Sequence, residues 1–469
     1  MIASIGFIAN GNLKIRGKIF QRLFGCWGGA IILADISLES RHSPNGKWMD
    51  RSTLAVFLIG VSFCFVSAVL RDRLNRLPFA EEAIVAGHLI HGDGFLSPYD
   101  ASPGAPPSCY CAPIYPLIIA GAFRILETSH AIVGLLIVNA ISFGVIVSGV
   151  FSLARFYVSL LAGWIAVALL LVHPVLIYFI TDWWDTYVAL AIFVGLLVAA
   201  ALPFGRRWRW GCVVMGTAMG LLSLTNASYA LAYPLIVLIA LRQLDWRRRV
   251  LGIGICCISF AIVLSPWAVR NLVAFDRFIP VRGGTAYYLW LGNQPDAFGW
   301  LDADAVRAGP AFDHRERAMI LMMGEPAYFD LCGFRLKEVY SSDPEEFWAR
   351  SARRLLFVFM SDPTRSYLPF PLLSDRKIQE IYIDRALLHG AVMLLGLAGM
   401  WTAWRLKLRC GWIFAAGILA EVPFIFSFGS DRYNLPMRVI LLFFAAILIA
   451  CVIQRVRCGS WTTRREENF

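Results

Sequence analysis

Residues 54–70 read LAVFLIGVSFCFVSAVL, an apolar run without a charged residue. It approaches the length of about 20 residues that an α-helix needs to cross a bilayer. Further runs of this kind follow at 131–150, 160–180, 186–203, 211–225, 229–241, 250–268, 386–404, 411–428 and 435–453. Because backbone groups in lipid must be hydrogen-bonded internally, these runs predict about ten transmembrane helices.

The composition favours the same fold class. Of 469 residues, 58% are hydrophobic and only 16% are charged, which is too apolar for a soluble protein of this size. The abundant Trp, Tyr and Phe residues fit interfacial belts and lipid-facing surface. The net charge of +11 fits basic cytoplasmic loops, and no soluble basic domain is available to bind nucleic acid. We therefore expect an all-α polytopic membrane protein.

Four short basic stretches set the orientation. They are RRWRW (206–210), RQLDWRRR (242–249), RLKLR (405–409) and QRVRCGSWTTRR (454–465). With ten spans, all four fall on one side, which the positive-inside rule assigns to the cytoplasm. The apolar stretch at 113–126 is short and begins with proline, so we expect a juxtamembrane or re-entrant helix there. An additional span at that point would break the agreement.

The predicted organisation has five parts. They are a cytoplasmic N-terminal segment (1–52), a transmembrane catalytic module (53–268) that includes an outer loop (71–112), an extracytoplasmic loop domain (269–385), C-terminal transmembrane helices (386–453) and a cytoplasmic tail (454–469). Helical patterns at 325–340 and 344–360 indicate that the loop domain is folded. The first fifty residues show no cleavable signal-peptide pattern, and Met49 is an alternative start.

Two other motifs are given minor roles. Cys109 and Cys111 lack the C-x-x-C spacing and His partners of a zinc site, although a disulfide from one of them to Cys332 stays open. LDADAV (301–306) contains a D-x-D motif but lies on the outer side, where nucleotide sugars are absent, so we interpret it as a solvated loop.

The informative polar residues gather at the outer ends of the spans. They are the carboxylates Glu81, Glu82, Asp182 and Asp185 and the arginines Arg270, Arg282 and Arg432. A carboxylate beside an apolar wall can act as a general base, because partial burial raises its pKa. Arginine binds phosphate through a planar fork of donors, and basic residues at this side oppose the usual charge bias. Simple solvation, or pairing with Asp182, Asp431 or lipid headgroups, is the alternative.

Several segments together resemble the GT-C class of membrane glycosyltransferases, in particular glycosyltransferase family 39, the protein O-mannosyltransferase and aminoarabinose transferase-like group. They are EEAIVAGHLIHGDGF (81–95), the PP-x-YP-like segment 106–126, FITDWWDTYVAL (179–190), GLLSLTNASYALAYP (220–234), SPWAVRNLVAFDRFIPVRGGTAYYLWLGN (265–293), MGEPAYFDLCGFRLKEVYSSDPEEFW (323–348) and SDRYNLP (430–436). The matches follow the family order over residues 54–453. Glu81, Val85 and Asn226 replace the family's Asp, Tyr and Arg.

The resemblance implies an inverting transferase that moves a sugar from a polyprenyl-phosphate donor to an acceptor hydroxyl. Glu81 or Glu82 would be the base. Other implied roles are acceptor or metal assistance by Asp182 and Asp185, donor-phosphate binding by Arg270, Arg282 and Arg432, and a sugar pocket that includes Tyr433, Tyr287, Tyr288, Trp290 and Asn293. A divalent cation, Mg or Mn, would lie between Glu82 and Asp182.

The implied partners are the lipid-linked donor, a glycan, lipid or protein acceptor, and membrane lipids. The implied location is the plasma (inner) membrane, with the active site on the extracytoplasmic side. Two alternatives remain. The substitutions at Glu81, Val85 and Asn226 fit a catalytically inactive GT-C-like scaffold. A secondary transporter would place polar residues near the bilayer midplane in repeated halves, but here they lie at outer span ends and no repeat is visible.

Overall fold

The structure is a computed structural model that describes residues 50–71, 81–203, 205, 207–295, 297, 309–359, 375–427 and 429–457, with side chains omitted over 375–389. Met49, most of the N-terminal segment and LDADAV (301–306) lie outside this part of the chain. The described residues form helices and connecting turns, with an isolated β-bridge between Leu96 and Pro107.

Each of the expected spans is a helix. They are α2 (Arg51–Leu70), α5 (Thr128–Tyr157), α6 (Leu160–Val172) continued by α7 (Pro174–Phe179), α8 (Thr186–Ala201), α9 (Trp208–Thr225), η3 (Ala227–Ala232) continued by α10 (Tyr233–Ala240), α11 (Trp246–Phe275), α17 (Asp375–Arg405), α18 (Gly411–Phe426) and α19 (Leu435–Arg457). Within the described ranges, α2, α5, α11 and α19 are long and apolar enough to cross a membrane, and shorter apolar helices accompany them. The protein is an all-α polytopic membrane protein.

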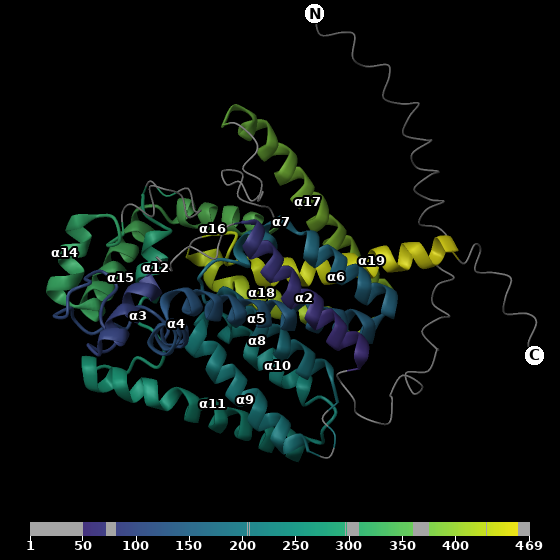
Figure 1. The fold of residues 1–469 in the computed structure, drawn as a ribbon, viewed down its shortest axis with the longest axis horizontal. Coiled ribbons are helices and arrows are strands. Elements are labelled where there is room, and N and C mark those ends of the chain that lie inside the picture. Colours follow the sequence, from purple (N-terminus) through teal and green to yellow (C-terminus); the bar gives the residue numbers. More distant parts are fainter. Residues whose placement is uncertain are drawn as a thin grey trace, which may run out of the picture.

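The remaining helices lie outside this set of spans. They are α3 (Glu81–His91), α4 (Ile114–Ile125), α12 (Thr285–Leu291), α14 (His314–Met323), α15 (Glu325–Ser342) and α16 (Pro344–Phe359). Figure 1 shows α3, α12, α14 and α15 together at the left end of the molecule. The short α4 packs against α3, as expected for a juxtamembrane helix at 113–126. Helices α15 and α16 confirm the two helical patterns predicted in the loop domain.

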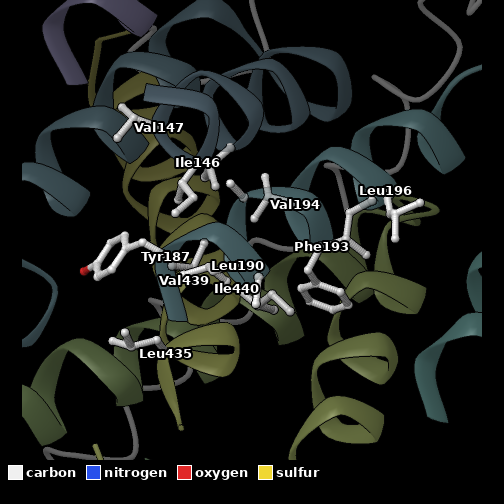
Figure 2. Close-up of a cluster of buried hydrophobic side chains, with 14 of the residues drawn as sticks. Ile146, Val147, Tyr187, Leu190, Phe193, Val194, Leu196, Leu435, Val439 and Ile440 are labelled. Atoms are coloured by element: carbon white, nitrogen blue, oxygen red, sulfur yellow. The ribbon is translucent and has the colours of Figure 1, made fainter. Parts of the chain in front are cut away.

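The centre of the bundle is built where α5, α8 and α19 meet. Figure 2 shows Ile146 and Val147 of α5 beside Leu190 and Val194 of α8 and Val439 of α19, all buried. Lipid tails are as apolar as these side chains, so helix association depends on close packing. Gly144 of α5, for example, lies so close to α2 that a Cβ atom would meet the Phe57 ring.

The described parts of the predicted basic stretches, 207–210, 242–249, 405–409 and 454–457, lie together at one end of this bundle. Arg242 donates hydrogen bonds to the carbonyls of Ala200 (2.8 Å) and Ala201 (3.0 Å). These bonds join the stretch at 242–249 to the end of α8, which precedes the stretch at 207–210. Trp412 donates to the Tyr157 hydroxyl (3.2 Å), and the Gln454 amide donates to the Ser159 hydroxyl (3.4 Å). The stretches at 405–409 and 454–457 therefore flank the end of α5. Tyr157 is also in electrostatic contact with Arg242. This end is called the basic end below.

One open possibility from the sequence is not realised. Cys109, Cys111 and Cys332 are all free thiols, so none of them is joined in the disulfide considered above. They are buried instead in an aromatic cluster with Tyr287 and Phe329. Cys109 faces the close-packed Gly283 there, and these thiols serve as small apolar side chains.

Candidate active site

A pocket of about 630 Å³ lies at the end of the molecule opposite the basic end. Helix α8 fixes this relation, because it begins beside the pocket at Asp185 and ends at Ala201, where Arg242 binds. The lining comes from distant parts of the chain: Glu81, Glu82, Ile84, Pro98, Tyr99, Ala101, Tyr110, Cys111, Ala112, Tyr115, Trp184, Asp185, Thr225, Asn226, Arg282, Tyr287, Tyr288, Leu291, Ala311, Phe312, Arg317, Arg432 and Tyr433.

The first turn of α3 gives the pocket its paired acids. Glu81 and Glu82 begin this helix, where a negative charge interacts favourably with the helix dipole. Successive helical residues point in directions about 100° apart, so the two carboxylates are directed differently, although both act on Cys111. Glu82 interacts electrostatically with Asp185 and Arg432, whereas the charge of Glu81 acts on Tyr99 and its neighbours. The pocket therefore has two chemically different sides.

The arginine side is defined by Glu82, Asp185, Arg282 and Arg432. The Arg432 guanidinium lies 3.8 Å from the Trp184 ring centroid and 4.5 Å from that of Tyr433, and it also donates to the Tyr433 hydroxyl. These contacts fix the plane of the guanidinium. Asp185 accepts a hydrogen bond from the Asn226 amide (3.1 Å), so Asn226 orients this carboxylate.

Buried polar contacts support the loop that carries Arg432. Asp431 and Arg438 form an ion pair with 1% or less of either side chain exposed. The Asn434 amide donates to the Phe357 carbonyl (3.0 Å) and so ties the same loop to α16. Breaking such a buried pair is costly, because the remaining charge is left without compensation. Arg432 is therefore presented to the pocket from a rigid support.

The charges on the arginine side influence each other. Burial, together with the carboxylates of Glu81 and Asp185, raises the pKa of Glu82 to about 8 against the opposing effect of Arg432. Burial also raises the pKa of Asp185, and Arg432 and Arg282 oppose that shift. The Oε2 atom of Glu82 is buried without a hydrogen-bond partner among the described residues. These effects favour the protonated form of Glu82 relative to that of an exposed glutamate.

The tyrosine side is defined by Glu81, Tyr99, Tyr110 and Tyr287. Tyr110 lies at the centre, with its ring centroid 5.4 Å from that of Tyr99 and 6.0 Å from that of Tyr287, both in edge-to-face arrangements. Burial raises the pKa of Tyr99 and of Tyr110, and nearby tyrosines and Glu81 raise both further. These phenols stay protonated, and neutral hydroxyls of this kind can donate and accept hydrogen bonds.

The boundary between the two sides is formed by Tyr288. Its ring lies 5.7 Å from that of Tyr110 on the tyrosine side, and the Arg282 guanidinium lies 4.8 Å from its centroid on the arginine side. An Arg over an aromatic face is stabilised by the ring quadrupole. A ligand that spans the pocket would therefore cross from a cationic surface to a hydroxyl-rich one over this residue.

Most of the predicted site residues meet in the pocket. Those that line it are Glu81, Glu82, Asp185, Arg282, Tyr287, Tyr288, Arg432 and Tyr433. Asp182, Arg270, Trp290 and Asn293 are not part of its lining. Asp182 precedes the pocket-lining stretch, and its backbone carbonyl accepts a hydrogen bond from the Asn139 amide (2.9 Å).

The other three residues outside the lining have structural contacts. Arg270 donates to the carbonyls of Ser108 (2.6 Å) and Phe95 (2.7 Å) and so holds the first outer loop. The buried Asn293 donates to the Phe426 carbonyl (2.9 Å). Trp290 carries the Arg335 guanidinium over its ring, 5.0 Å from the centroid. These contacts assemble the walls behind the pocket.

The pocket also contains residues that the sequence did not indicate: Tyr99, Tyr110, Tyr115, Trp184, Phe312 and Arg317. Aromatic residues are common at membrane interfaces, so the sequence gives no reason to select these. For the metal, the described part of the chain places no group of three or more His, Cys, Asp or Glu residues where an ion could be held. The cation predicted between Glu82 and Asp182 stays a prediction, and Asp182 does not line the pocket.

The fold and this pocket define a polytopic all-α membrane protein with an acid- and arginine-lined cavity at one end of its bundle. No family model and no curated protein matches the chain. Its structure is similar to two crystal structures of ArnT from Cupriavidus metallidurans. For the one bound to undecaprenyl phosphate, identity is 15%, coverage is 86% of this chain and 79% of that chain, and the TM-score is 0.38. For the apo state, identity is 17%, coverage is 82% of this chain and 77% of that chain, and the TM-score is 0.35.

Proposed function

We propose that this protein is a membrane glycosyltransferase that moves a sugar from a polyprenyl-phosphate donor to an acceptor hydroxyl on the extracytoplasmic face. One observation carries the proposal: paired acids and two arginines from distant parts of the chain meet in a pocket opposite the basic end. The positive-inside rule makes the pocket end extracytoplasmic. The ordered motifs that resemble family 39 support the same reaction.

The arginine side is suited to the donor phosphate. Arg432 is held between rings, and Arg282 lies over Tyr288, so both present planar donors without needing to reorganise. Arginine matches phosphate geometry through two parallel hydrogen bonds. Asp185 begins α8 and Arg432 precedes α19, which places this side at the ends of spanning helices. A lipid tail attached to the phosphate would extend along those helices.

The two neighbouring acids take different roles in this reaction. Glu82, with its pKa raised to about 8, is mostly protonated at neutral pH and adds no negative charge beside the leaving phosphate. The charge of Glu81 acts on Tyr99 and Tyr287, whereas the charge of Glu82 acts on Arg432. An acceptor must attack the anomeric carbon from the side opposite the leaving group. We therefore assign Glu81 as the general base.

The bond changes then follow. The acceptor hydroxyl gives its proton to Glu81, and its oxygen forms the new bond to the anomeric carbon. The bond between that carbon and the phosphate oxygen breaks, and the electron pair leaves with the polyprenyl phosphate. Arg282 and Arg432 stabilise the charge that develops there. Attack opposite the leaving group inverts the anomeric configuration.

The direct test uses the purified full chain in lipid with a panel of polyprenyl-phosphate sugars and mixed glycan, lipid and peptide acceptors. We expect release of free polyprenyl phosphate from at least one donor and a much slower release with Glu81→Gln. If every donor is inert, or if the variant is as fast as the parent, the inactive-scaffold alternative replaces this proposal. Repeating the assay after EDTA and after added Mg²⁺ or Mn²⁺ tests the predicted cation.

A further inference from the structure

An exposed aromatic ring stands at the mouth of the pocket. Phe312 lines the pocket although 61% of its surface is exposed. It lies on the turn just before α14, in the loop domain. A large apolar side chain kept in water at the rim of a polar cavity has no packing role that explains its position. Such a ring can instead serve as a contact surface for a ligand.

The backbone that carries this ring is fixed. The Arg317 guanidinium donates to the Pro310 carbonyl (3.0 Å) and to the Ala311 carbonyl. Asp313 caps α14 by accepting a hydrogen bond from the Arg315 amide (2.7 Å). Because both ends of the turn are held, the backbone position from which the Phe312 ring projects is fixed. A preorganised contact loses less entropy when a ligand binds than a mobile one does.

The pocket lining also contains three tyrosines whose side chains are largely buried. Tyr99, Tyr110 and Tyr287 form the adjacent wall, and burial keeps the pKa of each phenol raised, so the hydroxyls remain neutral. A saccharide matches this surface, because one face of a sugar ring presents C–H groups to an aromatic ring while its edges present hydroxyls. Glu81 is the acid at this wall and can accept the reacting proton.

We infer that the acceptor is a saccharide of at least two sugar units. This rests on the proposed function, because it assigns the acceptor class of the same pocket. The reacting sugar lies against the Tyr99, Tyr110 and Tyr287 wall with its hydroxyl toward Glu81, and the next sugar stacks on Phe312.

The test measures binding of three neutral trisaccharides, maltotriose, cellotriose and mannotriose, to the purified chain in nanodiscs by saturation-transfer NMR. We expect saturation of the ring C–H protons of at least one trisaccharide. Phe312→Ala should weaken its binding about tenfold, the size of one aromatic contact. Phe312→Trp should bind that trisaccharide about as well as the parent does. Phe334→Ala is the matched control, since Phe334 is 64% exposed on α15 and does not line the pocket.

Donor turnover, measured in parallel, separates the two proposals. If the parent releases polyprenyl phosphate but binds no trisaccharide, or if Phe312→Ala binds as well as Phe334→Ala, the saccharide assignment is wrong and the transferase stands. If Phe312→Ala instead raises only the donor KM, the ring contacts the lipid and the assignment also fails. Binding that depends on Phe312 without turnover of any donor supports the saccharide site and removes the proposed function.

Discussion

The arginine side and the tyrosine side of the pocket come from different parts of the architecture. The first includes helix ends in the bundle, with Asp185 directly before α8 and Asn226 directly after α9, together with Glu82 of α3 and Arg282 of the segment before α12. The second comes from the first outer loop, through Tyr99 and Tyr110, and from α12, through Tyr287. One side thus draws partly on the ends of apolar bundle helices, and the other on the loop after α3 and on α12. This difference suits a reaction between a lipid-linked donor and a water-borne acceptor.

The largest expected effect tests whether the neighbouring acids belong to opposite sides. Glu81→Gln should lower the rate of polyprenyl phosphate release about 10²–10⁴-fold at pH 7, because it removes the general base. Glu82→Gln should have a much smaller effect, since glutamine resembles the protonated acid. Initial rates at saturating donor are the measurement. A larger loss for Glu82→Gln would reverse the two roles.

The second prediction concerns the phosphate contact. Arg432→Ala should reduce kcat about 10²–10³-fold, the usual cost of removing one donor that stabilises charge in a transition state. Arg277→Ala is the control, because Arg277 forms an exposed ion pair with Asp330 on the loop domain (2.6 Å) and exposed pairs contribute little. Equal losses in the two variants would show that Arg432 has no specific role on the arginine side.

The sequence predicts the fold and much of the arginine side for one physical reason. Backbone in lipid must be helical, so the apolar runs fix where the spans lie, and α2 and α5 cover the runs at 54–70 and 131–150. Charged residues are excluded from those runs, so the ones that remain gather at the ends. Asp185 and Arg432 are visible in the sequence because they interrupt a pattern.

The sequence does not distinguish residues whose local patterns are alike. Arg270 and Arg432 both lie at outer span ends, yet Arg270 points to the carbonyls of Ser108 and Phe95, and only the folded loop shows that. The aromatic Tyr99 and Tyr110 resemble ordinary interfacial residues until the structure brings them to Glu81. Non-local packing of loops decides these cases, and no local periodicity encodes it.

The pH dependence sharpens the contrast between the acids. The pKa of Glu82 is raised from about 4.5 to about 8, so between these values the folded protein keeps a proton that the unfolded chain has lost. The contribution of Glu82 to stability therefore falls as pH rises from about 4.5 to about 8. Above pH 8 its charge would also oppose phosphate binding at Arg432. We expect the turnover rate to decline there.

Glu82→Gln provides the control for that decline. Because glutamine cannot ionise, the variant should keep its rate above pH 8, and its thermal unfolding temperature should fall less than that of the parent between pH 5 and 8. Rates and unfolding temperatures across this range are the measurements. If the turnover rate of Glu82→Gln still declines above pH 8, a group other than Glu82 causes the decline.

The smallest effect on turnover is expected for Arg270, whose role the structure separates from that of Arg432. Arg270→Ala removes two hydrogen bonds that hold the outer loop, so it should lower the free energy of unfolding by about 1.5–3 kcal/mol, the range for a lost bond to a charged group. Below its unfolding temperature the variant should keep its donor KM, because Arg270 does not line the pocket. If folded Arg270→Ala has a raised donor KM, Arg270 contributes to phosphate binding, and its role is then not different from that of Arg432.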